Sequence, residues 1–134
     1  VVGSKVTEEI QALHSEENGI IIKGFVTEEE LASLYASCRI VVAPLRYGAG
    51  VKGKIVEAIY NGAPIVTTSV GAEGIPGVET VLEVADDPDD FAVKTAELYA
   101  DKDRLLAMCR RTQTYIREHF SVDAAWKVIE EDFS

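Results

Sequence analysis

Apolar residues along the chain follow two kinds of pattern. Short runs that are almost wholly apolar and rich in β-branched residues occupy 20–26, 40–43, 65–68 and 81–84. Such runs are too short for helices and are typical of strands covered on both faces. Between and after them, apolar residues recur at helical spacing around 6–18, 27–35, 51–60, 88–100 and 102–118. The alternation predicts an α/β fold with a doubly wound parallel sheet between helices.

Several helix boundaries have their own sequence signatures. Thr27 and Glu30 match a capping box, in which each side chain bonds a backbone N–H near the other residue. Asp87 followed by Pro88 is typical of a helix start, and Asn61-Gly62 marks the end of the 51–60 helix. After Ser121, apolar residues at 122, 126, 129 and 133 predict one further amphipathic helix.

Length and composition indicate one soluble globular domain over residues 1–134. The chain is 47% hydrophobic and 27% charged, and no apolar run approaches the roughly 18 residues of a membrane span. Its net charge of −10 repels phosphate backbones, so nucleic acid is not an expected partner. The first residues match no secretory signal, and we expect a cytoplasmic protein cut from a longer one.

The cysteines, histidines and acidic run give no support for a metal site. Cys38 and Cys109 cannot form a multi-bridge framework, and we expect both to be reduced core thiols. His14 and His119 have no companion at ligand spacing, and we expect both on the surface of helices. The acidic run at 86–90 is better explained as a helix cap with a solvated face.

Parallel sheets bind ligands beyond the carboxyl ends of their strands, which directs attention to the loops 24–27, 44–50 and 68–77. Between Leu31 and Val56 every charged residue is basic, although the chain as a whole is acidic. These basic residues are Arg39, Arg46, Lys52 and Lys54. The segregation of charge predicts a local site for an anion.

The loop before the 51–60 helix has the features of a diphosphate site. Gly48 and Gly50 let a ligand approach the backbone, and a helix beginning near Val51 directs its free N–H groups at the same point. Lys52 and Lys54 add positive charge. The alternative is a tight turn with solvated lysines.

Glu57 stands in an otherwise apolar stretch of the same helix. A carboxylate close to the sheet and to a phosphate site requires a partner, and the two hydroxyls of a ribose would provide one. The alternative is an ion pair with Lys54 or Arg46.

These segments resemble the second half of the GT-B-fold, retaining family 4 ("group 1") glycosyltransferases, over Val1 to about Phe133. The resemblance is carried by Gly24-Phe25-Val26, Tyr35-Ala36-Ser37-Cys38-Arg39-Ile40-Val41-Val42-Ala43-Pro44, Gly48-Ala49-Gly50-Val51-Lys52-Gly53-Lys54, Glu57-Ala58, Asn61-Gly62-Ala63-Pro64-Ile65-Val66-Thr67-Thr68 and Val70-Gly71-Ala72-Glu73-Gly74. It implies a Rossmann-like domain that binds a nucleotide-diphospho-sugar, with UDP or GDP as the nucleotide, and transfers a hexose-type sugar without metal or other cofactor.

The resemblance also assigns roles to individual positions. It implies that Gly24 and Val26 frame the base, and that Glu57, the second Glu of the family's E-x7-E motif, holds the ribose. The diphosphate and sugar would be bound by the residues Arg46, Gly48, Ala49, Gly50, Val51, Lys52 and Lys54. The motif's first Glu is replaced by Ala49, and Lys52 stands where many members have Gly. The G-x-G-V-K-G-K form places Lys52 against a phosphate.

Other parts of the family's active site are not in this sequence. The Arg and Lys that clamp the phosphates belong to an earlier strand, loop and helix, so we expect a sheet truncated at its N-terminal strand. The acceptor-binding N-terminal domain is also missing, and we assign no catalytic residue and expect the fragment alone to be inactive. The resemblance implies that the 121–133 helix packs against that domain, and it leaves open a peripheral association of the full-length enzyme with a membrane.

Two other functions remain open. One is half of a sugar-nucleotide epimerase of the same fold. The other is a non-catalytic nucleotide-binding or regulatory module such as a receiver domain. A receiver domain would need acidic residues at its strand ends, where this chain has Pro44, Thr68 and Gly71.

Overall fold

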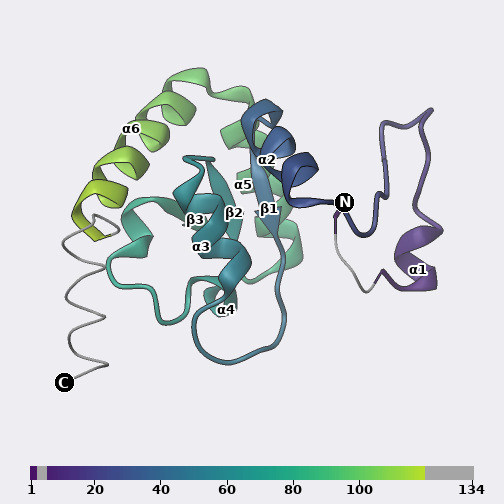
Figure 1. Ribbon diagram of the computed structural model, residues 1–134, viewed down its shortest axis with the longest axis horizontal. Helices are drawn as coiled ribbons and strands as arrows, with labels where there is room; N and C mark the ends of the chain where they lie inside the picture. Colours follow the sequence, from purple (N-terminus) through teal and green to yellow (C-terminus); the bar gives the residue numbers. More distant parts are fainter. Residues whose placement is uncertain (3–5, 120–134) are drawn as a thin grey trace. The chain divides into compact units, whose positions relative to one another are not determined.

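The computed structural model describes residues 1–2 and 6–119 (Figure 1). The chain divides into two compact units, Val1–Leu34 and Tyr35–Ser134. None of the helices in the described part has the length and apolar character that a membrane span requires. The amphipathic helix predicted after Ser121 lies outside these residues.

Unit 2 is built on a parallel sheet, which confirms the predicted α/β class. Its strands are β1 (Val41–Ala43), β2 (Ile65–Thr67) and β3 (Leu82–Val84), in the order β1-β2-β3. Val41 pairs with Ile65, which pairs with Leu82. β2 is therefore the central strand and has a hydrogen-bonded neighbour on each side.

The helices follow the predicted order. Around the sheet lie α3 (Gly53–Tyr60), α5 (Pro88–Ala100) and α6 (Lys102–His119), close to their predicted bounds. The shorter α4 (Ser69–Ala72) and the 3-10 turn η1 (Val78–Thr80) occupy segments expected to be irregular. The remaining helices are α1 (Glu8–Gln11) and α2 (Glu28–Ser37).

The two faces of the sheet bury different helices. On one face Ile65 packs with Ile55 and Ile59 of α3, and on the other Val66 packs with Leu98 of α5. Successive residues of a strand point to opposite faces, so adjacent positions of β2 serve separate cores. This arrangement confirms that a central strand of the sheet is covered on both sides.

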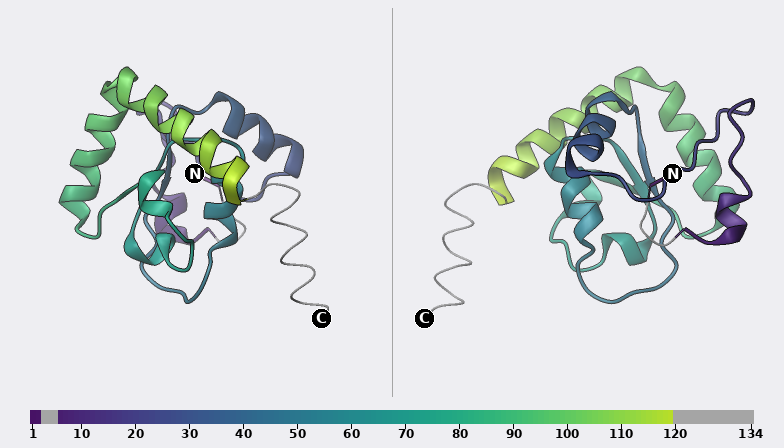
Figure 2. Two further views of the ribbon diagram at one scale, coloured as in Figure 1. Left: turned by 90° about the vertical axis from the view of Figure 1, so that its left-hand side faces the viewer. Right: turned by 45° about the vertical axis from the view of Figure 1, so that its right-hand side comes forward.

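α6 contributes to both cores. Leu105 and Met108 belong to the core beneath α5, whereas Tyr115, two turns further on, belongs to the core beneath α3. Figure 2 shows the helix passing from α5 toward α3. α6 therefore links the two faces of the domain.

The predicted strand at 20–26 is wrong. The segment forms only isolated bridges among the described residues, from Ile20 to Ser15 and from Gly24 to Val2. Ile20 and Ser15 exchange both backbone hydrogen bonds, at 2.8 and 2.9 Å, so the run begins by turning back on its own preceding residues. Phe25 is 78% exposed, and only Ile22 of the isoleucine run is buried.

The same turn shortens the first helix. α1 ends at Gln11 instead of continuing to Asn18. The expectation of a helical His14 is therefore wrong, and its Nδ1 accepts a hydrogen bond of 3.0 Å from the Ile22 N–H. His119, by contrast, is an exposed residue at the end of α6, as predicted.

Two expectations about burial are also wrong. β1 is an edge strand of this sheet, and Val42 is 49% exposed instead of covered. Cys38 is exposed and Cys109 is half-buried, so neither is a core residue, although both are free thiols as expected.

The predicted caps have direct counterparts. Thr27 Oγ1 accepts from the Glu30 N–H at 3.1 Å, which is one half of the capping box. Asp87 Oδ2 accepts from the Asp90 N–H at 3.0 Å at the start of α5. The acidic run thus begins a helix, and Asp86 accepts from the Ser69 N–H and hydroxyl at 2.9 and 2.5 Å.

We expect Gly71→Ala to destabilise the chain by about 1–3 kcal/mol because its new Cβ would meet a buried group. An ideal Cβ at Gly71 lies 2.0 Å from Thr67 Oγ1. Gly53→Ala is the matched control, since nothing lies within 4 Å of its Cβ. Urea unfolding of both variants measures the difference, and equal stabilities would contradict the close packing of Gly71 on Thr67.

Ser69→Ala should make stability less dependent on acid pH. Hydrogen bonds from the Ser69 side chain and backbone hold the pKa of Asp86 below its usual value. A lowered pKa stabilises the folded state above the unfolded pKa of about 4, and this contribution disappears as pH falls through the folded pKa. The variant should therefore be less stable at pH 7, with a gap that narrows in acid. An NMR titration in which the Asp86 pKa does not rise in Ser69→Ala would refute this explanation.

Candidate functional site

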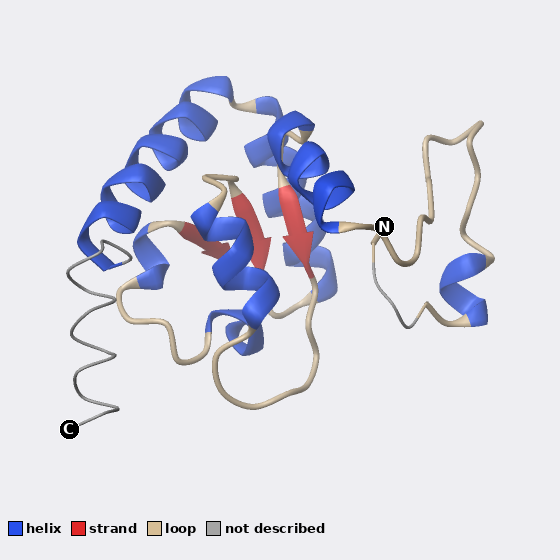
Figure 3. Cartoon of the chain, in the orientation of Figure 1, coloured by secondary structure: helices blue, strands red, loops and turns tan. Residues whose placement is uncertain are grey.

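Two loops lie beyond the carboxyl ends of the strands in unit 2. The segment 44–52 connects β1 to α3, and α4 with the segment 73–77 follows β2. Figure 3 shows the strand arrows pointing toward this end of the sheet. This is the edge at which open parallel sheets bind ligands.

Two buried threonines fix the start of the first loop. Thr67 Oγ1 donates to the Ala43 carbonyl at 2.8 Å, and Thr68 Oγ1 donates to the Leu45 carbonyl at 2.5 Å. Thr68 Oγ1 also accepts from the Gly71 N–H at 3.3 Å, at the start of α4. The central strand therefore anchors the segments that follow both β1 and β2.

Glycines allow the two loops to meet. A Cβ at Gly74 would lie 3.0 Å from Val51 Cγ2 and 3.4 Å from the Val51 backbone nitrogen. Gly74 has φ +78° and Gly50 has φ +75°, a region that other residues rarely adopt. The loop before α3 thus packs directly on the segment after α4.

Lys52 is folded back over its own loop. Its Nζ donates to the Gly50 carbonyl at 2.6 Å and lies 3.8 Å from Glu73 Oε2, and its side chain is only 16% exposed. Gly48 makes room for it, because a Cβ there would be 2.8 Å from Lys52 Cε. The backbone of Lys52 caps α3, which begins at Gly53 and not at Val51.

The other predicted anion-binding residues of this loop are open to solvent. Arg46, Ala49 and Lys54 are exposed, and Val51 is 54% exposed. Gly48 and Gly50 expose their backbone beside them. Arg46, the glycines and Lys52 thus lie on one loop, Lys54 follows in the first turn of α3, and Lys52 is the most enclosed of these cations.

Arg39 does not belong to this cluster. It precedes β1 and so lies at the opposite end of that strand from the segment 44–52, which we call the glycine loop. Its Nε donates to the Tyr99 carbonyl at 2.8 Å, and its guanidinium carbon lies 4.8 Å from the centre of the Tyr99 ring. The basic residues of 31–56 therefore lie in two separate places. Arg39 contacts Tyr99, whereas the other three lie on the glycine loop and in the first turn of α3.

Glu57 is exposed on α3, so the argument that its carboxylate requires a partner is wrong. Among the described residues no ion pair joins it to Lys54 or Arg46. Burial, and then the charge of Glu57, raise the pKa of the Tyr35 hydroxyl, which places the carboxylate near that ring. Glu57 is available to a ligand from solvent.

Gly24 and Val26 belong to unit 1. Gly24 has φ +67° and forms a backbone bridge with Val2, and Val26 is half-buried. These residues lie in a loop and not in the strand predicted for them.

A small apolar hollow of about 230 Å³ borders the glycine loop. Val51 and Gly74 line it on one side and the end of α6 on the other. There the Tyr115 ring stacks on His119 at 4.0 Å, and its hydroxyl donates to the Pro76 carbonyl at 2.6 Å. Sequence reasoning missed Tyr115 and His119, because helical spacing does not show which loop a helix end meets.

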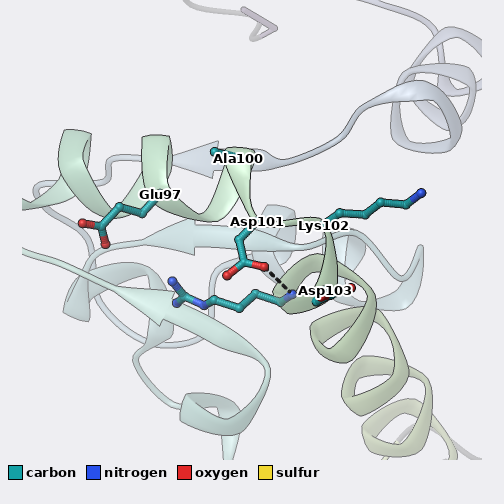
Figure 4. A pocket seen from close by; sticks show the side chains of 6 residues that line it. Glu97, Ala100, Asp101, Lys102 and Asp103 are labelled. Carbon is teal, nitrogen blue, oxygen red and sulfur yellow. Dashed lines mark hydrogen bonds between the residues drawn. The ribbon is translucent and has the colours of Figure 1, made fainter.

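A larger hollow of about 680 Å³ lies at the turn between α5 and α6 (Figure 4). Its polar groups are those of a helix start, since Asp101 Oδ1 accepts from the Arg104 N–H at 3.1 Å. Because α5 runs back from the carboxyl end of β3, this turn lies away from the glycine loop. In the described part of the chain no three His, Cys, Asp or Glu side chains are grouped as metal ligands.

Comparison with known protein families gives a match over most of the chain. The family model described as "Glycosyl transferases group 1" matches residues 1–101, which include the glycine loop and Glu73. No curated protein matches the chain. Because the match covers 101 of the 134 residues, the chain belongs to the group 1 glycosyltransferases, and its α/β unit is part of a glycosyltransferase domain.

Proposed function

We propose that this chain is the donor-binding half of a retaining glycosyltransferase. The enzyme would transfer a hexose-type sugar from a nucleotide-diphospho-sugar whose nucleotide is UDP or GDP. The observation that carries the proposal is the glycine loop at the carboxyl edge of the sheet, with Lys52 enclosed within it. Group 1 membership supplies the reaction class, and a nucleotide-diphospho-sugar is the ligand whose charge suits this loop.

The diphosphate would lie against the backbone of Gly50 and Val51. The amino end of α3 points at this position and has no side chain bonded to its first N–H groups, so its partial positive charge favours an anion. Lys52, Lys54 and Arg46 supply formal charges around it. Such a concentration of positive charge lets a protein of net charge −10 bind an anion.

Glu57 would bind the ribose. It lies one turn further along α3 than Lys54, is exposed, and has a carboxylate that can accept from two hydroxyls. Gly24 and Val26 would frame the base through backbone groups. Ala49 leaves no carboxylate at the position of the first motif Glu, so the donor sugar would be held by backbone and solvent contacts there.

We assign no catalytic residue and no metal or other cofactor to this chain. In this proposal an N-terminal domain of the same protein binds the acceptor, and an earlier strand, loop and helix of the donor-binding domain supply the remaining phosphate clamp. The full-length enzyme would work in the cytoplasm, with a peripheral association with a membrane left open. The fragment by itself would bind donor without transferring sugar. Detectable turnover of a nucleotide-sugar by the purified chain would contradict the expectation that the fragment alone is inactive.

An amide NMR titration of the chain with UDP, GDP and ADP tests the donor site. We expect shifts concentrated on 48–57 and 24–27 for one of these nucleotides, because the loop and α3 would contact diphosphate and ribose. Shifts scattered over the surface, or confined to the α5–α6 turn, would count against the proposal.

Two variants test the proposed diphosphate contact and the proposed ribose contact independently. Lys52→Ala should weaken binding of the preferred nucleotide and of inorganic pyrophosphate alike, by about tenfold, as for loss of a hydrogen bond to a charged group. Glu57→Gln should weaken the nucleotide and leave pyrophosphate unchanged. Lys102→Ala, which removes an exposed cation at the α5–α6 turn, is the control. Isothermal calorimetry measures all three, and equal losses in Lys52→Ala and Lys102→Ala would show that only net charge matters.

A further inference from the structure

Glu73 is an acidic residue in contact with the glycine loop, and nothing in the proposed donor contacts uses it. It follows α4 directly and precedes Gly74, the glycine on which Val51 packs. Its Oε2 lies 3.8 Å from Lys52 Nζ. The contact between the two loops therefore brings a carboxylate to the most enclosed cation of the site.

The two contacts of the Lys52 ammonium differ in strength. The bond to the Gly50 carbonyl, at 2.6 Å, is a short charge-assisted hydrogen bond within the loop. The contact with Glu73, at 3.8 Å, is at the outer limit of an ion pair, and the Glu73 side chain is 51% exposed. The first contact orients the ammonium, whereas the second is weak and easily exchanged.

Gly48 keeps the ammonium in this position. Lys52 Cε occupies the space that a Cβ at residue 48 would fill, 2.8 Å away, so the side chain lies across the loop instead of extending into solvent. The Nζ is thus held where an anion on the loop backbone would meet it. An ammonium has three donors, and a phosphate oxygen can take the place of the carboxylate without disturbing the bond to Gly50.

We propose that Glu73 is a positioning residue that pairs with the Lys52 ammonium as its counter-ion in the free protein and is displaced by the donor diphosphate. In the free protein the carboxylate neutralises Lys52. When a diphosphate binds, its oxygens replace Glu73 as counter-ion and the exposed carboxylate turns to solvent. The inference rests on the proposed function for the identity of the anion, but the contact between Glu73 and Lys52 can be tested without any ligand.

The first experiment measures the reactivity of single lysines. The chain is treated briefly with an amine-acylating reagent, and the extent of labelling at each lysine is read by mass spectrometry. In Glu73→Gln we expect Lys52 to react about two- to fivefold faster, as for loss of a weak ion pair. Lys54 serves as the internal control, and Glu97→Gln, which removes an exposed carboxylate from α5, as the matched variant. Added salt should shrink the difference at Lys52, because it screens an ion pair but not a packing defect.

The second experiment measures binding of inorganic pyrophosphate and of UDP and GDP. Removal of the competing carboxylate should strengthen binding in Glu73→Gln by about two- to fivefold, with no equal gain in Glu97→Gln. Unchanged labelling of Lys52 in Glu73→Gln would overturn the positioning role. Faster labelling without tighter binding would overturn the displacement by diphosphate. If the wild-type chain binds none of the three probes, the proposed function and the displacement fail together, and the labelling result still decides the contact.

Discussion

The arrangement of the site depends on the complete burial of β2. Ile65, Val66 and Thr67 have no exposed surface, because β1 and β3 flank the strand and helices cover both faces. A buried hydroxyl must find a partner, so Thr67 at the end of the strand donates to the carbonyl of Ala43. Thr68 repeats this with Leu45. The central strand thereby fixes the point at which the neighbouring chain leaves the sheet and becomes the glycine loop.

Three glycines, which lack side chains, determine how the rest of the site packs. Gly71 leaves room for the Thr67 hydroxyl, Gly74 lets Val51 approach, and Gly48 leaves room for Lys52. A side chain at any of these three positions would push neighbouring groups apart. Because none is present, the loops after β1 and β2 come into contact. The same sequence feature thus produces both the close packing of the loops and the exposed backbone that a ligand could approach.

The sequence predicted most of unit 2 because its signals are local. Continuous apolar runs identified the strands at 41–43, 65–67 and 82–84, and the Asp87 cap identified the start of α5. The strand prediction failed at 20–26 because an apolar run indicates a preference for extended backbone but does not show that a partner strand is present. Ile20 pairs with the nearby Ser15, and no ladder forms among the described residues.

The candidate site was predictable only to the level of the loop. Charge and glycine spacing placed Gly48, Gly50 and Lys52 together, and the resemblance to the family pointed to the same loop. Neither could show that Arg39 binds Tyr99 at the other end of β1, since residues close in sequence can lie at opposite ends of a strand.

Nor could sequence show that Glu73 reaches Lys52, because that contact depends on the packing of Gly74 against Val51. Its consequence is electrostatic. An enclosed ammonium loses part of its hydration, and a nearby carboxylate offsets this cost. In the proposed displacement, the anion takes over that role. A weak, half-exposed partner is suited to that role, because a strong buried pair would resist exchange. The geometry around Lys52 combines a fixed cation with a replaceable counter-ion, which is what an anion site in an acidic protein requires.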